Sequence, residues 1–134
     1  MTQRFTITNV SVYIGYSESL SHLMYAGADF LLMPSRVEPC GLNQMYALRY
    51  GTMPIVRNVG GLKDTVVDMG DDQGFGIRFN ESSVWDVTYS VGRAIDLYYN
   101  RKAQMKEMIE FMMKIDHSWE TSANKYLELY KSLK

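Results

Sequence analysis

The stretch DFLLMPSRVEPCGLNQMYALRYGTMPIVRNVGG, from Asp29 to Gly61, decides the fold of this chain of 134 residues. It contains two almost continuously apolar runs, DFLLMPS and MPIVRNVGG, and such runs are typical of strands that are covered on both faces. Between them, LNQMYALRYG has the pattern of a helix, and Gly51 is its expected C-terminal stop. A strand, a helix and a second buried strand in succession predict a parallel sheet.

The same alternation continues on both sides of this stretch. Before it, NVSVYIGY predicts a strand, and Ser17 is expected to cap a following helix that buries Leu20, Leu23 and Met24. After it, LKDTVVDMG predicts a short helix and GFGIRF a short strand. We therefore expect an α/β fold, namely a partial Rossmann-like parallel sheet of about four strands with flanking helices.

Helices are expected throughout the remainder of the chain. One begins after Ser83 and breaks near Asn100, and a second contains a run of core methionines. A last helix begins after Ser118 and carries an apolar stripe that calls for a partner, made of Trp119, Ala123, Tyr126, Tyr130 and Leu133.

The composition excludes several classes of protein. The 14 basic and 15 acidic residues are spread without blocks, so we expect neither nucleic acid nor a membrane surface as a partner. No apolar run approaches the ~20 residues of a membrane span, and MTQRFTITNV lacks the apolar core of a signal peptide. One cysteine allows no internal disulfide. The expectation is a cytoplasmic protein without cofactor or metal.

The candidate site is the loop from Ser35 to Asn43. Ligands of open parallel sheets bind beyond the carboxyl ends of strands, and this loop follows a predicted strand. The helix that begins near Gly41 leaves its first N–H groups unpaired, which suits a phosphate. Glu38 would suit a polyhydroxyl part of the same ligand. The residues alone thus predict an α/β piece that binds a phosphorylated small molecule.

Three residue types at or near this loop leave alternatives open. Cys40 could be a nucleophile at a helix N-terminus, but a small, tightly packed residue that presents its backbone is the favoured interpretation, because no base accompanies it. A structural role is favoured for His22 and His117. Tyr16 fits a rim tyrosine and a residue that stacks on a base equally well.

The segment from Gly15 to Val66, which contains EPCGL and the GGLKDTV run, closely resembles the C-terminal domain of bacterial glycogen synthases and plant starch synthases. The likeness runs from about Asn9 to the C-terminus. It implies a retaining glycosyltransferase of two Rossmann-like domains (the GT-B fold) that moves glucose from ADP-glucose, or UDP-glucose in some members, to the non-reducing end of an α-1,4-glucan, with no metal.

The resemblance also implies roles for single residues. Glu38 is the implied catalytic residue and bonds hydroxyls of the donor glucose. Backbone N–H groups of Cys40, Gly41 and Leu42 face glucose and diphosphate, Asn43 helps at the distal phosphate, and Tyr16 stacks on adenine. In the wider superfamily a second glutamate stands where this chain has Tyr46, so the chain follows the synthase branch.

By the same resemblance, residues 9–134 are part of a C-terminal nucleotide-sugar-binding domain, and residues 1–8 are a leader or start-site remnant. The Lys-Thr-Gly-Gly loop, the acceptor groove and the cations for the diphosphate are expected in the missing N-terminal portion. A chain of these residues should therefore be inactive alone. A weak ADP-sugar-binding module and a self-associating fragment are the alternatives, the latter a homodimer through the exposed strand edge of Phe30 to Met33 and the C-terminal helix.

Overall fold

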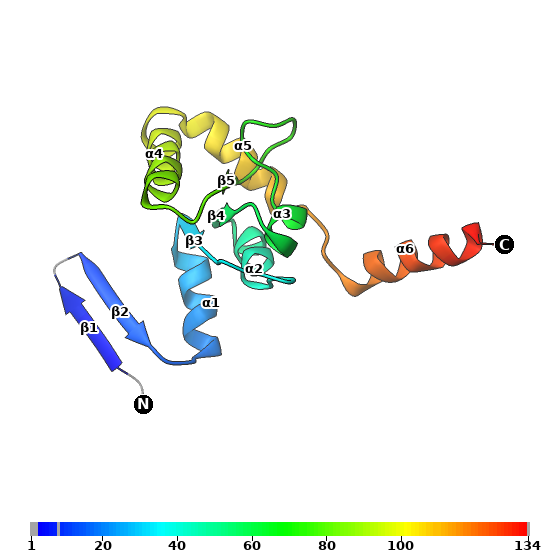
Figure 1. Cartoon of the computed structure of the whole chain (residues 1–134), viewed down its shortest axis with the longest axis horizontal. Helices are drawn as coiled ribbons and strands as arrows, with labels where there is room; N and C mark the ends of the chain where they lie inside the picture. Colours follow the sequence, from blue (N-terminus) through cyan, green and yellow to red (C-terminus); the bar gives the residue numbers. More distant parts are fainter. Residues whose placement is uncertain (1–2, 8, 134) are drawn as a thin grey trace.

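The computed structural model describes residues 3–7 and 9–133 and confirms the α/β fold. Its body is a parallel sheet in the order β3 (Phe30–Met33), β4 (Met53–Arg57) and β5 (Ile77–Phe79), with β4 in the middle (Figure 1). The helices are α1 (Glu18–Gly27), α2 (Asn43–Tyr50), α3 (Gly60–Thr65), α4 (Val84–Asn100), α5 (Lys102–Met112) and α6 (Trp119–Ser132).

Two apolar clusters lie on either side of the sheet, as the buried strands predict. Ile55 of β4 belongs to the larger cluster, which α4 and α5 complete, whereas the next residue, Val56, belongs to the smaller cluster with Leu62 of α3. This alternation follows from the two-residue period of a strand. The methionines expected in the core are buried: Met105, Met108 and Met112.

Helix boundaries that were predicted from a single local residue are confirmed. The Ser17 hydroxyl accepts a hydrogen bond from the Leu20 N–H at 3.3 Å and begins α1. Gly51 ends α2 with a φ of 82°, a left-handed conformation that glycine adopts without strain. The break near Asn100 separates α4 from α5.

The first predicted strand does not join the parallel sheet. β2 (Val10–Ile14) pairs antiparallel with β1 (Gln3–Ile7), so the parallel sheet has three strands among the described residues and not about four. The reason is that β1 directly precedes β2, and a hairpin partner needs no crossover connection. β3 is left at an edge of the sheet, as expected.

The burial expected for α1 is also not found. None of its residues is buried, and the Leu23 side chain is 70% exposed. The hairpin of β1 and β2 stands apart from the body and does not cover this helix (Figure 1). Thr52 nevertheless ties the end of α1 to the body, since its hydroxyl donates to the carbonyl oxygens of Tyr25 and Ala28.

A partly buried ion pair fixes the segment between α3 and β5. Asp68 accepts from the Arg93 guanidinium at 2.6 Å and from the backbone N–H groups of Arg78 at 2.6 Å and Gly70 at 2.8 Å. Burial acts to raise the pKa of Asp68. The hydrogen bonds from Arg93, Arg78 and Gly70 outweigh that effect and hold the pKa below its ordinary value.

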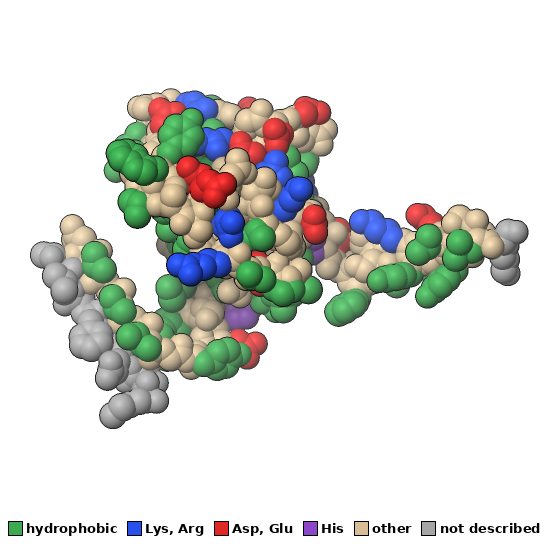
Figure 2. All heavy atoms as spheres, viewed as in Figure 1, with side chains coloured by type: hydrophobic (Ala, Val, Ile, Leu, Met, Phe, Trp, Pro, Cys, Tyr) green, Lys and Arg blue, Asp and Glu red, His purple; other side chains and the backbone are tan. Residues whose placement is uncertain are grey.

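Helix α6 projects from the body, and its apolar stripe is exposed (Figures 1 and 2). The Trp119 side chain is 91% exposed. Three hydrogen bonds define the start of α6: the Ser118 hydroxyl accepts from the Thr121 N–H at 3.3 Å, and Asp116 accepts from the Ser118 N–H at 2.8 Å and the Thr121 hydroxyl at 2.6 Å.

Among the described residues, none of the helices has the length and apolar character of a membrane span.

Candidate functional site

The candidate site is the loop between β3 and α2, at the carboxyl end of the edge strand. Arg57, at the end of β4, braces the loop from the neighbouring strand, because its guanidinium donates to the carbonyl oxygen of Arg36 at 2.7 Å and to that of Asn80 at 3.1 Å. The loop is therefore attached to the sheet edge where ligands of open parallel sheets bind.

Glu38 is half-buried in this loop. Its Oε2 accepts a hydrogen bond from the Ser35 hydroxyl at 3.3 Å, and its carbonyl oxygen accepts from the Gly61 N–H at 3.0 Å. Among the described residues, no group donates to its other carboxylate oxygen. One oxygen is thus oriented by the protein and the other can receive a hydroxyl of a ligand.

Two glycines at the start of α3 allow the loop to lie directly on that helix. A Cβ atom at Gly61 would stand 1.8 Å from the carbonyl oxygen of Cys40, and one at Gly60 would stand 2.0 Å from that of Glu38. Gly60 also has a φ of 48°. This pair was not predicted to belong to the site, although glycines next to a strand often indicate a close backbone approach.

The predicted anion-binding backbone lies at Gly41, Leu42 and Asn43. Gly41 has a φ of 71° and Leu42 is in the right-handed region, a succession that forms a concave group of N–H donors. No acceptor contacts these three N–H groups in the part of the chain that the structure describes, and no side chain caps α2. The site residues named from the sequence are thus contiguous here, apart from Tyr16.

Gln44 was missed by sequence reasoning. Its side chain is fully buried, and its Nε2 donates to the carbonyl oxygens of Cys40 at 3.3 Å and Gly41 at 3.0 Å, and to the Thr65 hydroxyl at 3.0 Å. Its Oε1 is buried without a hydrogen-bond partner. The signal that could have identified it is its position three and four residues before Ala47 and Leu48, on the buried face of α2.

The expectation for Cys40 needs one correction. Its side chain is exposed rather than tightly packed. What is packed is its carbonyl group, which lies against Gly61 and Gln44. Neither histidine is hydrogen-bonded to the thiol among the described residues: His22 Nδ1 lies 3.2 Å from the Tyr50 hydroxyl, and His117 lies in the connection to α6. Neither histidine of the described residues is therefore placed to act as a base for Cys40.

Tyr16 lies in the connection between β2 and α1, and 88% of its side chain is exposed. In the part of the chain that is described, no hydrogen bond or ring contact joins it to the loop of Glu38. Tyr46 lies on α2, where its ring stacks on that of Tyr25 with centroids 6.1 Å apart. Stacking of Tyr16 on a base stays a prediction.

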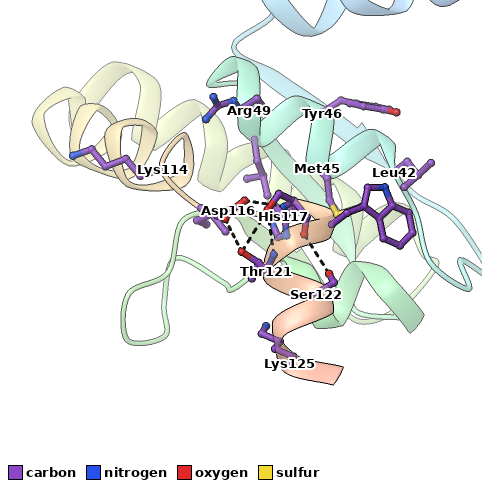
Figure 3. A pocket seen from close by; sticks show the side chains of 14 residues that line it. Leu42, Met45, Tyr46, Arg49, Lys114, Asp116, His117, Thr121, Ser122 and Lys125 are labelled. Atoms are coloured by element: carbon purple, nitrogen blue, oxygen red, sulfur yellow. Dashed lines mark hydrogen bonds between the residues drawn. The ribbon is translucent and has the colours of Figure 1, made fainter. Parts of the chain in front are cut away.

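A cavity of about 860 Å³ lies beside this loop, between α2 and the segment that leads into α6 (Figure 3). Leu42 is the only one of the six predicted site residues among its described lining residues. Arg49, Lys114, His117 and Lys125 also line it. The cavity adjoins the candidate site through Leu42 but does not contain Glu38.

Comparison with known proteins shows similarity to one class of enzyme. A family model described as "Glycosyl transferases group 1" matches residues 2–111. The chain is 57% identical over 122 residues to a glycogen synthase of Flavobacterium johnsoniae, covering 91% of this chain and 25% of the relative. It is 49% identical over 126 residues to a glycogen synthase of Thermodesulfovibrio yellowstonii, covering 94% of this chain and 24% of the relative.

Among solved structures, the chain is similar to the catalytic domain of starch synthase IV from Arabidopsis thaliana, which is bound to ADP and acarbose. The TM-score is 0.81 at 41% identity, and the match covers 89% of this chain and 25% of that chain. The present chain spans about a quarter of the length of the curated relatives that it matches.

Proposed function

The chain belongs to the group 1 glycosyl transferases, and from that premise we propose that it forms part of the nucleotide-sugar-binding half of a glycogen synthase. In this proposal, the parent enzyme transfers glucose from ADP-glucose to the non-reducing end of an α-1,4-glucan with retention of configuration. The observation that carries the proposal is that one loop contains both the Ser35-oriented carboxylate of Glu38 and the N–H groups of Gly41, Leu42 and Asn43, which no acceptor contacts among the described residues.

The two parts of this loop suit the two parts of a nucleotide sugar. The unpaired N–H groups at the start of α2 carry partial positive charge and favour a diphosphate. Glu38 offers a carboxylate oxygen to the sugar hydroxyls, and the hydrogen bond from Ser35 orients that carboxylate. The charge of Glu38 would repel a phosphate directly above it, so we place glucose next to Glu38 and the diphosphate next to Gly41 and Leu42.

Retaining transfer needs more than this half-site. The leaving diphosphate must be stabilised as its charge develops, and the acceptor hydroxyl must be held on the same face of the sugar. We assign these tasks, and the contact with the α-glucan acceptor, to the N-terminal portion of the parent enzyme. A polypeptide of these 134 residues is therefore expected to bind ADP weakly, because a helix terminus alone contributes about 0.3–2 kcal/mol toward an anion.

The names of the relatives and the ADP in the starch synthase structure support a nucleotide-sugar ligand. The choice between ADP and UDP is part of the test below. We also propose that the domain comprises residues 9–134 and that the protein is cytoplasmic, as the sequence predicts.

The test is an NMR titration of the 15N-labelled chain with ADP, UDP and ADP-glucose. We expect chemical-shift changes at Gly41, Leu42 and Tyr16. Glu38→Gln should weaken the binding of ADP-glucose and leave that of ADP unchanged, because Glu38 contacts the sugar and not the phosphates. Glu107→Gln on α5, an exposed glutamate outside the loop, is the control with the same change of side chain and should change neither.

Two results would contradict this proposal. One is a set of shift changes that avoids the loop from Ser35 to Asn43. The other is release of ADP from ADP-glucose by the 134-residue chain that depends on glycogen and exceeds that of Glu38→Ala, since the half-site would then suffice for transfer.

Self-association is a second candidate function, and one observation favours it. β3 lies at the edge of the sheet, and Leu32 of that strand is exposed. An unpaired apolar edge is a template for pairing with another strand. Association of two copies through this edge and through α6 stays a prediction.

A further inference from the structure

We infer that Gln44 is a positioning residue for the phosphate-binding loop: its buried amide holds two peptide units so that the N–H groups of Gly41 and Leu42 face the ligand. The inference rests on the proposed function, since it concerns how that same loop is shaped. Gln44 touches neither substrate nor reacting atoms in this view and acts only through the loop.

The side-chain amide of Gln44 is committed to donating hydrogen bonds. Its nitrogen lies within 3.3 Å of three oxygens that can accept, on Cys40, Gly41 and Thr65. Only the nitrogen of an amide carries protons, so the opposite orientation would place an oxygen against three oxygens. The orientation of the amide is therefore determined by its surroundings.

These contacts set the direction of the neighbouring N–H groups. In a trans peptide unit, the carbonyl oxygen of one residue and the N–H of the next point in opposite directions. Because Gln44 holds the Cys40 carbonyl toward the interior, the N–H of Gly41 points away from it. The hold on the Gly41 carbonyl turns the N–H of Leu42 away in the same manner. The two donors predicted to bind the diphosphate are thus oriented from behind.

Gln44 also connects the loop to α3. The Thr65 hydroxyl receives the hydrogen bond from Gln44 and donates its own proton to the carbonyl oxygen of Gly61 at 2.6 Å. Gly61 is the residue on which Cys40 packs. The loop is therefore held by Gln44 through Thr65 as well as directly.

The arrangement carries a cost that simple packing would avoid. Gln44 Oε1 is buried and has no hydrogen-bond partner, and an unsatisfied buried acceptor is destabilising. A methionine would fill a similar volume without leaving that oxygen unpaired. A glutamine at this position is explained by its two amide protons, which a methionine lacks. Gly41 completes the fit, because a Cβ there would stand 2.6 Å from Gln44 Oε1.

The test compares Gln44→Met with Thr65→Val in the ADP titration of the 15N-labelled chain. Gln44→Met removes the hold on both carbonyl groups, and we expect ADP to bind about tenfold more weakly. Thr65→Val removes the third acceptor and the hydrogen bond from Thr65 to the Gly61 carbonyl, but it leaves the hold of Gln44 on both loop carbonyl groups. Its effect should therefore be within about twofold. Urea unfolding of both variants gives the change in stability, and Met108→Ala on α5 serves as a destabilised control that should bind ADP like the wild type.

A second variant gives a readout that a merely structural role would not move. Gln44→Glu keeps the size of the side chain, but an ionised carboxylate cannot donate to carbonyl groups. Burial raises the pKa of such a carboxyl, so it regains one O–H donor as the pH falls. We expect its ADP affinity, relative to the wild type at each pH, to rise at least twofold between pH 8 and pH 5.5.

The outcomes separate this inference from the proposed function. If the wild type shows no ADP-dependent shifts at Gly41 and Leu42, the proposed function fails. If the wild type binds there and Gln44→Met binds equally well, or Gln44→Glu shows no relative gain at low pH, the role of Gln44 is overturned. A loss in Gln44→Met that Met108→Ala reproduces at equal stability overturns it as well.

Discussion

The loop after β3 and helix α6 both expose many side chains, but they are held in opposite ways. In the loop, the backbone is fixed from outside: Gly61 and Arg57 each donate to one of its carbonyl groups, and Gln44 donates to two. In α6, the backbone hydrogen bonds lie within the helix, and the apolar side chains are exposed (Figure 2). Whether a segment is fixed is therefore shown by the contacts of its backbone and not by the exposure of its side chains.

The largest expected effect contrasts the body with α6. Leu97→Ala removes a fully buried side chain from the main core cluster, so we expect the free energy of unfolding to fall by about 3–4 kcal/mol. Trp119→Ala should change it by less than about 0.5 kcal/mol, because that ring is exposed. Urea unfolding followed by circular dichroism measures both. A large loss in Trp119→Ala would show that α6 packs on a partner in solution.

The second prediction tests whether the loop between β3 and α2 is supported by its contact with Gly61. Gly61→Ala places a methyl group on the Cys40 carbonyl oxygen, and we expect a loss of about 2–3 kcal/mol together with shifts of the Gly41 and Leu42 amide signals. Gly92→Ala is the matched control: it lies inside α4, and beyond the neighbouring backbone of that helix no atom of the described residues lies within 4 Å of its added Cβ. It should stabilise the chain by about 0.5–1 kcal/mol. If both substitutions have the same effect, the loop does not pack on Gly61.

The sequence predicted the features that depend on local residues, but not those that depend on contacts between segments. The boundaries of α1, α2 and α4 were predictable because each depends on a local residue: Ser17, Gly51 and Ser83. The buried strands were predictable from their apolar runs. The placement of β2 was not predicted, because the segment Gln3–Ile7 was not recognised as a strand that could pair with it in a hairpin.

The candidate site shows the same limit. Glu38 and the start of α2 were found from a carboxylate and a helix N-terminus after a strand, which are local features. The roles of Gly60, Gly61 and Gln44 depend on which segments meet across the loop. A glutamine in a helix ordinarily faces water, so its burial could be read only from the helix face that it shares with Ala47 and Leu48.

The smallest expected effect concerns pH and the ion pair of the body. In the folded chain the pKa of Asp68 is held below the ordinary value of about 3.9 that it has in the unfolded chain. The ionised carboxylate therefore stabilises the fold above about pH 3.9, and this contribution is lost as the pH falls through the pKa of the folded chain. Asp68→Asn should therefore destabilise the chain by about 1–2 kcal/mol at pH 7 and by less at pH 3. Urea unfolding at both pH values checks this, with Asp72→Asn, an exposed neighbour, as control. An equal loss at both pH values would contradict it.

The hydrogen bonds among Asp116, Ser118 and Thr121 fix the start of α6, so a rotation at this point displaces the whole helix. A helix of 14 residues is about 21 Å long. A turn of about 10° at its base therefore moves its tip by about 4 Å, close to the spacing of neighbouring strands in a sheet. Because these three hydrogen bonds join residues 116–121 only to one another, a small rotation just before Asp116 moves every aromatic ring along the helix together.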